Sequence, residues 1–316
     1  MKKNISILFL AIIILLILLL STSWIYNKVV TSKEIKETPP PGKMVLVNDH
    51  QMHVYTDGVG DTTIVFLSGG GTSAPTLDFK PLWSRLLKDH RIVVVEKAGY
   101  GWSDIADVSR DIDVILEETR TALKLAGENP PYVLAPHSMS GIEAIRWAQK
   151  YPKEVTAIIG LDPAIPESYE TMELPNRLIQ KLAAIAAHSG LLRFFPDVAN
   201  SSAAIQSSYL STEDEETYRA IFYRRTLTSN MQEEVNQIKE NAIKVKDDPI
   251  PIDTPMYFFI SDGEEIGIKN WQDMLINYTK HLPFGKYKIL DVGHYVHAWE
   301  PEYIADEINQ FLEELK

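Results

Sequence analysis

Short apolar runs that alternate with amphipathic segments are the feature that most constrains the fold of this 316-residue chain. The runs predicted to be strands are Met44–Val47, Met52–Thr56, Thr63–Ser68, Arg91–Glu96, Tyr132–Ala135, Val155–Asp162, Pro255–Ser261 and Tyr287–Val292. Several of them are apolar almost without a break, which is typical of strands that are buried on both faces. The segments between them, such as Asp111–Gly127, have helical spacing. This alternation predicts an α/β fold in which helices cover both faces of a mostly parallel sheet.

The alternation stops after Asp162 and resumes at Pro255. Between these two points the spacing of apolar residues predicts helices and no strand. A stretch of this length is too long for an ordinary connecting loop. We therefore expect residues 166–253 to form a helical lid, which is inserted into a core made of residues 44–165 and 254–316.

The N-terminus carries an apolar span, because no charged residue interrupts Ile5–Tyr26. As a helix with a rise of about 1.5 Å per residue, this span comes close to the ~30 Å hydrocarbon core of a bilayer. We expect residues 1–30 to be an uncleaved membrane anchor in the form of a transmembrane helix. The polar segment Thr31–Lys43 contains three consecutive prolines and is expected to be a semi-rigid linker.

A cleaved secretory signal is the alternative for the N-terminal segment. A signal usually has an apolar region of ~7–15 residues before small residues at the cleavage site, which Ser21 and Ser23 supply only weakly. Lys2 and Lys3 favour a cytoplasmic N-terminus. A single-pass protein with its catalytic domain outside the cytoplasm is therefore expected, whereas cleavage would give a secreted protein.

Composition excludes several classes of function. The chain has 43 acidic and 31 basic residues and a formal net charge of −12, without a long basic block. This balance argues against nucleic acid as a partner, because phosphate binding needs a clustered positive face. The chain has no cysteine, which excludes disulfides, thiolate metal ligands and a cysteine nucleophile.

The sequence APHSMSG, residues 135–141, follows a predicted strand and precedes a helical segment. Ligands of α/β sheets lie beyond the carboxyl ends of the strands. A sharp turn from strand to helix exposes a serine side chain when its neighbours are small, and Ser140 and Gly141 meet that condition. Ser138 is therefore a candidate nucleophile, and the alternative is an ordinary helix N-cap.

Three glycines, Gly69–Gly71, follow the end of another predicted strand. Glycines let the backbone pass close to a ligand, and here their amides could meet the amide of Met139 in an oxyanion hole. A flexible turn is the alternative. A phosphate-binding loop is disfavoured, because neither Lys-Ser nor Lys-Thr follows the glycines.

His294 directly follows the last predicted strand and so lies on the sheet edge that carries Ser138. A general base is required at that edge. His297, three residues later, could suggest a metal pair, but no second cluster of ligands supports one, so we expect no metal. The remaining histidines are expected to be structural, and they are His50, His53, His90, His137, His188 and His281.

Together these segments resemble the α/β-hydrolase superfamily of serine hydrolases with a helical lid, over about Met44–Lys316. PHSMSG is similar to the family's nucleophile elbow and SGGG to its oxyanion loop. EKAGYGWSD and GHYVHAWEPE are similar to two further motifs of the family. The resemblance implies that Ser138 is the nucleophile and His294 the base. It also implies that the amides of Gly70 and Met139 form the oxyanion hole.

The chain departs from the family pattern at three positions. Pro136 and Ser140 replace the two glycines of Gly-x-Ser-x-Gly, and Ser68 stands where many relatives have histidine. The family's haloalkane dehalogenases and epoxide hydrolases also resemble this chain, but they carry aspartate where it has Ser138.

The acid of the triad has three candidates. In the family it commonly follows the strand after the lid, where the register falls on Glu264, with Asp262 two residues earlier. Some relatives place it after the strand that precedes the lid, where this chain has Asp162. We rank Asp162 first, because a carboxylate at the end of a buried strand needs a partner such as a histidine N–H. Glu264 ranks second and Asp262 third.

These expectations describe a membrane-anchored serine hydrolase that cleaves a small-molecule ester, amide or thioester through an acyl-enzyme, without a cofactor. The alternatives are an acyltransferase, in which an alcohol replaces water, and a non-catalytic binding or receptor module. In the lid, the apolar residues Leu191, Leu192, Phe194 and Phe195 are expected either to roof an acyl pocket or to pack the lid onto the core.

Overall fold

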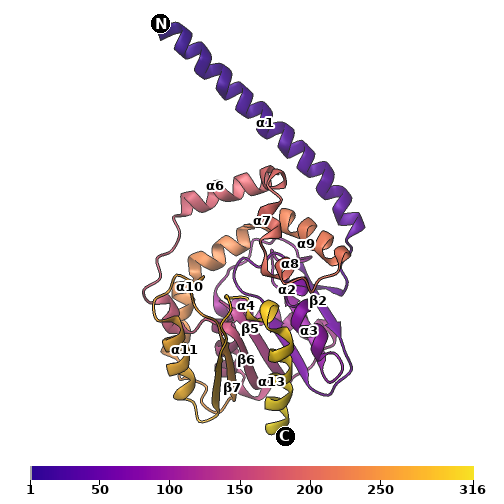
Figure 1. The fold of residues 1–316 in the computed structure, drawn as a ribbon, viewed down its shortest axis with the longest axis vertical. Helices are drawn as coiled ribbons and strands as arrows, with labels where there is room; N and C mark the ends of the chain where they lie inside the picture. The colour runs from indigo at the N-terminus through magenta and orange to yellow at the C-terminus, as the bar shows by residue number, and fades with distance from the viewer. Residues whose placement is uncertain (1) are drawn as a thin grey trace.

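The computed structural model describes residues 2–316, and its centre is an eight-stranded sheet covered by helices (Figure 1). The strands are β1 (Lys43–Val47), β2 (His50–Asp57), β3 (Thr63–Leu67), β4 (Arg91–Glu96), β5 (Tyr132–Ser138), β6 (Val155–Pro163), β7 (Met256–Ile260) and β8 (Gly285–Ile289). Their order in the sheet is β1-β2-β4-β3-β5-β6-β7-β8. The β1–β2 and β2–β4 pairs are antiparallel, and all pairs from β4–β3 to β7–β8 are parallel. The predicted α/β architecture is confirmed.

Two hydrophobic clusters fill the space between the sheet and its helices. Alternate residues of β3 point to opposite faces, so that Val65 belongs to one cluster and Phe66 to the other. The core helices are α2 (Pro75–Asp78), α3 (Lys80–Leu86), α4 (Ile112–Ala126), α5 (Gly141–Lys150), α11 (Trp271–Lys280), α12 (Val296–Trp299) and α13 (Pro301–Glu314), with the short 3-10 helix η1 (Pro152–Glu154). Helix α4 begins at the N-cap Asp111 and ends at Gly127, whose φ of +91° favours glycine.

The segment between β6 and β7 is helical. It contains η2 (Pro166–Tyr169), α6 (Arg177–His188), η3 (Leu191–Phe194), α7 (Asp197–Asn200), α8 (Ala203–Gln206), α9 (Thr212–Arg225) and α10 (Ser229–Asp247). Helix α9 starts with a capping box, in which Ser211 and Asp214 each accept a hydrogen bond from the other's backbone N–H. Helix α6 is the outermost lid helix, and α10 lies between it and the core (Figure 1).

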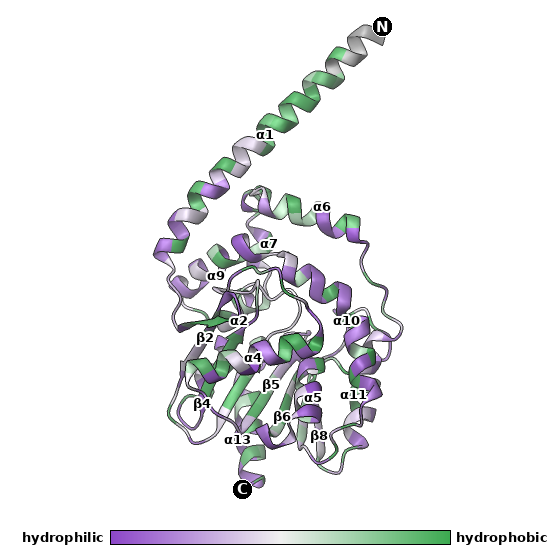
Figure 2. Cartoon of the chain, turned by 180° about the vertical axis from the view of Figure 1, so that it is seen from behind, coloured by the Kyte–Doolittle hydropathy of each residue, from purple (hydrophilic) through white to green (hydrophobic). Residues whose placement is uncertain are grey.

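One N-terminal helix, α1 (Lys2–Glu37), projects from the body (Figure 1). Its span Phe9–Glu37 is long and apolar enough to cross a membrane by length and composition. Figure 2 shows mostly hydrophobic colouring in the part of α1 away from the body and mixed colouring next to the body. These properties suit a membrane anchor and a signal sequence alike.

Helix α1 extends into the predicted linker Thr31–Lys43 as far as Glu37. Helix α1 continues to Glu37 because no proline or glycine interrupts it before Pro39 and because Glu34 is held by Arg193 of the lid at 2.7 Å. The three prolines that follow cannot continue a helix, so the chain leaves it there and enters β1.

We expect Phe258→Ala to lower the free energy of unfolding by about 3–5 kcal/mol, because a buried phenylalanine leaves a cavity. Phe258 lies in β7, is 1% exposed and stacks on Tyr278. The matched control is Phe284→Ala, since Phe284 is 58% exposed and its loss should change stability by less than about 1 kcal/mol. Urea unfolding of the full chain in detergent measures both, and equal losses would contradict the assigned burial.

Candidate active site

Ser138 is the last residue of β5, at the carboxyl end of a strand in the middle of the sheet. Its φ of +53° lies in the left-handed region, which costs a residue with a Cβ about 1–2 kcal/mol. Helix α5 begins three residues later at Gly141, where a Cβ would lie 2.1 Å from the carbonyl oxygen of Ala164. The close approach of α5 to the end of β6 therefore requires glycine, and the turn holds Ser138 in a strained conformation.

Ser140, and not Ser138, occupies the N-cap position of α5, so the N-cap alternative for Ser138 does not hold. The Ser140 hydroxyl is buried and lies within hydrogen-bond distance of two carbonyl oxygens, those of Leu67 at 2.6 Å and His137 at 2.8 Å. This explains why serine can replace the family's second glycine here. The hydroxyl links the elbow to the end of β3, where the glycine loop begins.

The glycine loop runs directly along the elbow. A Cβ on Gly69 would lie 2.9 Å from Cβ of Ser138, and one on Gly70 would lie 2.1 Å from Cε of Met139. Within residues 2–316 the backbone N–H groups of Gly70 and Met139 have no hydrogen-bond acceptor, and both residues line a cavity beside Ser138. Unpaired amides next to a partly buried serine are the donors that an oxyanion hole needs.

His294 lies in the loop after β8, and its ring is held by Asp162. The distance from Nδ1 of His294 to Oδ2 of Asp162 is 2.6 Å. Asp162 is fully buried near the end of β6, next to the strand that carries Ser138. The ring of His137, the residue before Ser138, packs against the His294 ring with centroids 4.6 Å apart. Three strands thus bring the serine, the histidine and the aspartate to one edge of the sheet.

The Asp162 carboxylate has four hydrogen-bond donors. Oδ1 accepts from the backbone N–H of Ser261 at 2.9 Å and from Nε1 of Trp271 at 2.8 Å. Oδ2 accepts from the Ser261 hydroxyl at 2.6 Å and from His294. An ionised carboxylate can only accept, so Nδ1 of His294 is the donor in this contact, and the lone pair of a neutral imidazole is then at Nε2.

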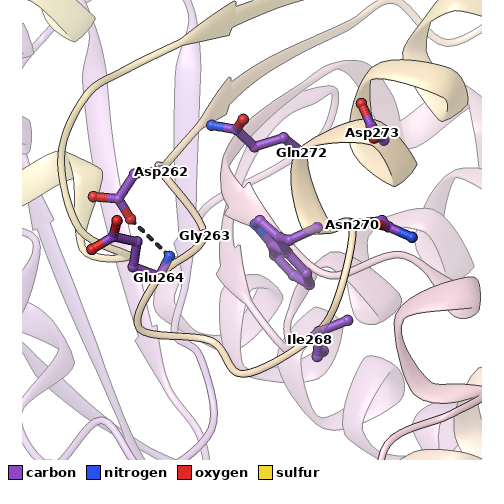
Figure 3. Close-up of a pocket in the computed structure, with 8 residues that line it drawn as sticks. Asp262, Gly263, Glu264, Ile268, Asn270, Gln272 and Asp273 are labelled. Carbon is purple, nitrogen blue, oxygen red and sulfur yellow. Dashed lines mark hydrogen bonds between the residues drawn. The ribbon is translucent and has the colours of Figure 1, made fainter.

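The rival carboxylates lie in the loop after β7, where Figure 3 shows Asp262 and Glu264 side by side. The backbone N–H of Glu264 donates to Oδ1 of Asp262 at 2.9 Å, so Asp262 shapes the turn. Their neighbour Glu265 accepts from the backbone N–H of His294 at 3.0 Å. Among the described residues Asp162 alone of the three candidates contacts the His294 ring.

His137 and His297 form a buried group around the site. His297 lies 3.1 Å from the buried carboxylate of Asp78, which agrees with a structural role. Burial and the neighbouring rings of His294 and His297 hold the pKa of His137 well below 6.5. A neutral His137 puts no positive charge beside the His294 ring.

Sequence reasoning missed the residues that hold the glycine loop against the lid. The Tyr100 hydroxyl accepts from the backbone N–H of Gly71 at 3.3 Å and donates to Glu234 of α10 at 2.7 Å. Lys97 forms a buried ion pair with the same carboxylate at 2.8 Å. Burial and the Glu234 carboxylate raise the pKa of Tyr100 well above 10, so this hydroxyl keeps its proton. Glu234 is an acid at a position that the helical spacing of α10 places on its buried side. This is the one sequence signal that could have indicated the contact.

The cavity beside Ser138 has a volume of about 300 Å³. Its apolar lining comes from η2, the segment after it, the turn before α10 and α10 itself, namely Tyr169, Met172, Leu227, Met231, Val235 and Ile238. This corrects our expectation for Phe194 and Phe195, which neither roof the pocket nor pack onto the core and are 60% and 62% exposed. Phe194 instead stacks on Tyr26 of α1, because η3 faces that helix.

Comparison with known proteins decides the family. The family model described as the alpha/beta hydrolase fold matches residues 62–301. The chain belongs to the α/β-hydrolase family. This α/β-hydrolase is 34% identical over 321 aligned positions to the uncharacterized protein YbdG of Bacillus subtilis (strain 168). That match covers 99% of this chain and 98% of YbdG.

Solved structures agree on the fold of this α/β-hydrolase. An epoxide hydrolase of Bacillus megaterium in complex with an inhibitor matches with a TM-score of 0.66 and 17% identity, over 86% of this chain and 100% of that one. A putative epoxide hydrolase of Pseudomonas aeruginosa matches with a TM-score of 0.67 and 14% identity, over 86% and 95% of the two chains. At these identities the likeness shows the fold alone.

The positive φ of Ser138 gives a stability test for the hydrolase elbow. We expect Ser138→Gly to be more stable than Ser138→Ala by about 1 kcal/mol, because glycine adopts this φ without strain, even after its greater unfolded-state entropy is counted. Both variants lack the hydroxyl, so each controls for the other in thermal unfolding. An alanine variant as stable as the glycine variant would show that the turn is unstrained.

Proposed function

We propose that this chain is a membrane-anchored serine hydrolase that cleaves an ester, amide or thioester of a small acyl substrate. The observation that carries the proposal is the His294–Asp162 hydrogen bond of 2.6 Å beside the Ser138 elbow. Family membership supports a hydrolase. The paired histidine supports serine chemistry, because a neutral imidazole with its Nδ1–H held by a carboxylate is a general base at Nε2.

Acylation follows from this arrangement. The Ser138 hydroxyl oxygen attacks the substrate carbonyl carbon while its proton passes to Nε2 of His294. The negative charge that develops on the carbonyl oxygen meets the free amides of Gly70 and Met139. The C–O, C–N or C–S bond of the substrate then breaks, and the leaving group takes the proton from the His294 imidazolium.

Deacylation repeats the same steps with water. His294 removes a proton from a water molecule, whose oxygen attacks the Ser138 ester. Collapse of the second oxyanion releases the acid, and the proton returns to the Ser138 oxygen. Asp162 stabilises the imidazolium in both halves, since its other three hydrogen bonds already hold the carboxylate in place.

The serine at position 138 argues against epoxide hydrolysis, the reaction for which the structural neighbours are named. Those neighbours are named epoxide hydrolases, and the epoxide hydrolases that this chain resembles carry an aspartate nucleophile. A serine nucleophile beside two backbone amides without an acceptor suits a carbonyl substrate instead. The apolar lining of the 300 Å³ cavity favours a substrate with an apolar acyl chain.

We infer that α1 holds the protein in a membrane. Its apolar residues are exposed along the whole stretch from Phe9 to Leu20, where a soluble helix would bury one side. Trp24 and Tyr26 follow this stretch, and such residues favour the membrane–water interface. Lys2 and Lys3 support an N-terminus in the cytoplasm and a catalytic domain outside it.

We expect Ser138→Ala to abolish both turnover of p-nitrophenyl esters and labelling by a fluorophosphonate, which forms an Oγ–P bond with loss of fluoride. Loss of a nucleophile can lower the rate by up to ~10⁶. Near-normal turnover by the pure variant would end the proposal. If the wild type is labelled and transfers its acyl group to added alcohols in preference to water, the chain is an acyltransferase. A wild type that is never labelled is a binding module.

We expect Asp162→Asn to lower turnover by up to ~10⁴, because the amide no longer selects the Nδ1–H tautomer of His294. Glu264→Gln is the matched control and should retain most activity, since Glu264 is exposed and lies outside the His294 contacts. Purified variants are compared by kcat/KM on one ester. A large loss in Glu264→Gln with an active Asp162→Asn would assign the acid to the loop after β7.

A further inference from the structure

Helix α6 turns its bulky apolar side chains outward. Leu178, Leu182 and Ile185, at spacings of four and three, are 66%, 57% and 63% exposed. The small residues Ala184 and Ala187 are the ones that it buries. A helix on a water-facing surface normally shows the reverse arrangement. The outer side of α6 is therefore built for an apolar neighbour outside the described chain.

The exposed apolar surface continues beyond α6. Ile179 is 66% exposed on the same helix, and Phe194 and Phe195 are exposed on η3, which packs against α6. The outer lid face is defined here as Leu178, Ile179, Leu182, Ile185, Phe194 and Phe195. Single exposed apolar residues are ordinary, whereas a contiguous patch marks an interaction site.

The end of α6 is fixed against α1. The Ser23 hydroxyl donates to the carbonyl oxygen of Ser189 at 2.8 Å, and Nδ2 of Asn27 donates to that of His188 at 3.1 Å. A Cβ on Gly190 would lie 2.6 Å from Cβ of Asn27, so glycine is needed for this close contact. Arg193 adds an ion pair with Glu34 at 2.7 Å. These contacts set the height of the lid along α1.

That height coincides with the end of the apolar run. The contacts begin at Ser23, and the apolar run ends at Leu20, which is about 5 Å away at the helical rise of 1.5 Å per residue. Tyr26, at the same level, stacks on Phe194 of the outer lid face with ring centroids 6.1 Å apart. If α1 spans a bilayer, the outer lid face lies at the level of the headgroups.

We propose that the outer lid face is seated in the headgroup region of the membrane that holds α1, so that the cavity beside Ser138 takes its acyl substrate from the lipid surface. One occupant, the bilayer, then covers both the apolar stretch of α1 and the outer lid face. The cations Arg177 and Lys181 of α6 are exposed along one side of its apolar residues and suit lipid phosphates. This inference rests on the proposed membrane anchor, and its substrate part rests on the proposed hydrolase.

Helix α6 of the lid also connects the outer lid face to the cavity beside Ser138. Gln180 of α6 lines the cavity together with Met172 and Pro175 from the segment that leads into the helix. The opposite side of the same helix carries the apolar stripe. A lipid that enters beside α6 therefore has only the width of one helix to cross before it reaches Ser138.

The test uses the absence of native cysteine, which lets one fluorophore be placed on the full chain. Three leucines of similar exposure are changed singly, Leu182→Cys, Leu16→Cys in α1 and Leu125→Cys on the core helix α4, at 57%, 53% and 53%. Each labelled protein is reconstituted in phosphatidylcholine–phosphatidylglycerol vesicles, with and without lipids brominated near the headgroup or in the acyl chain.

Brominated lipid should quench the labels at positions 16 and 182, and quenching at 182 should be several-fold above that at 125. Headgroup-proximal bromine should be the better quencher at 182. If position 16 is quenched while 182 behaves as 125 does, the proposal is overturned. If the label at 182 is shielded from water and lies close to the label of a second copy, a protein contact covers the face. That result also overturns the proposal. No quenching at 16 refutes the anchor itself.

Activity provides the second arm. The double variant Leu182→Glu/Ile185→Glu should cleave a water-soluble p-nitrophenyl ester at the wild-type rate but lose at least several-fold on a long-chain ester presented in vesicles. Leu125→Glu is the control and should change neither rate. Equal losses on both substrates would mean a structural defect and would overturn the substrate route. A wild type that cleaves neither ester refutes the hydrolase, while the quenching result still decides the seating of the lid.

Discussion

The hydrogen bonding of the buried Asp162 carboxylate is the interaction on which the candidate site depends. A charge at the end of a buried strand is tolerable only with full hydrogen bonding. Ser261, Trp271 and His294 supply that bonding from three separate segments, the end of β7, helix α11 and the loop after β8. The same bonds that satisfy the charge therefore align the imidazole and join the strand before the lid insertion to three segments that follow it.

A second buried charge ties the lid to the core. Glu234 of α10 meets Lys97 and Tyr100, and Tyr100 in turn holds the backbone of Gly71. The inner lid helix is thus part of the support for the glycine loop. The C-terminal end of helix α6, by contrast, is hydrogen-bonded to α1 through the carbonyl oxygens of His188 and Ser189. The lid has an inner layer that belongs to the site and an outer layer that belongs to the N-terminal helix.

Prediction from sequence succeeded where the signal was local. The strand runs, the helix that ends at Gly127 and the strand-to-helix turn at Ser138 all follow from patterns within about ten residues, and each is present in the structure. It did less well where several candidates shared the same local pattern. Asp162 lies near the end of one strand, and Asp262 and Glu264 follow another. The sequence ranked Asp162 first, but only its contact with His294, 132 positions away, separates it from the other two.

By itself the sequence determined the α/β class, the helical insertion, the apolar N-terminal helix and the serine and histidine at strand ends, because hydrophobic period and turn chemistry act over short distances. Only the tertiary structure decided which carboxylate holds His294, which residues line the cavity, and that Phe194 meets α1 instead of roofing the pocket. It also extended α1 into the expected linker as far as Glu37. These outcomes depend on which distant segments share one buried space, and hydrogen bonding and packing between such segments leave no mark in the local pattern of either one.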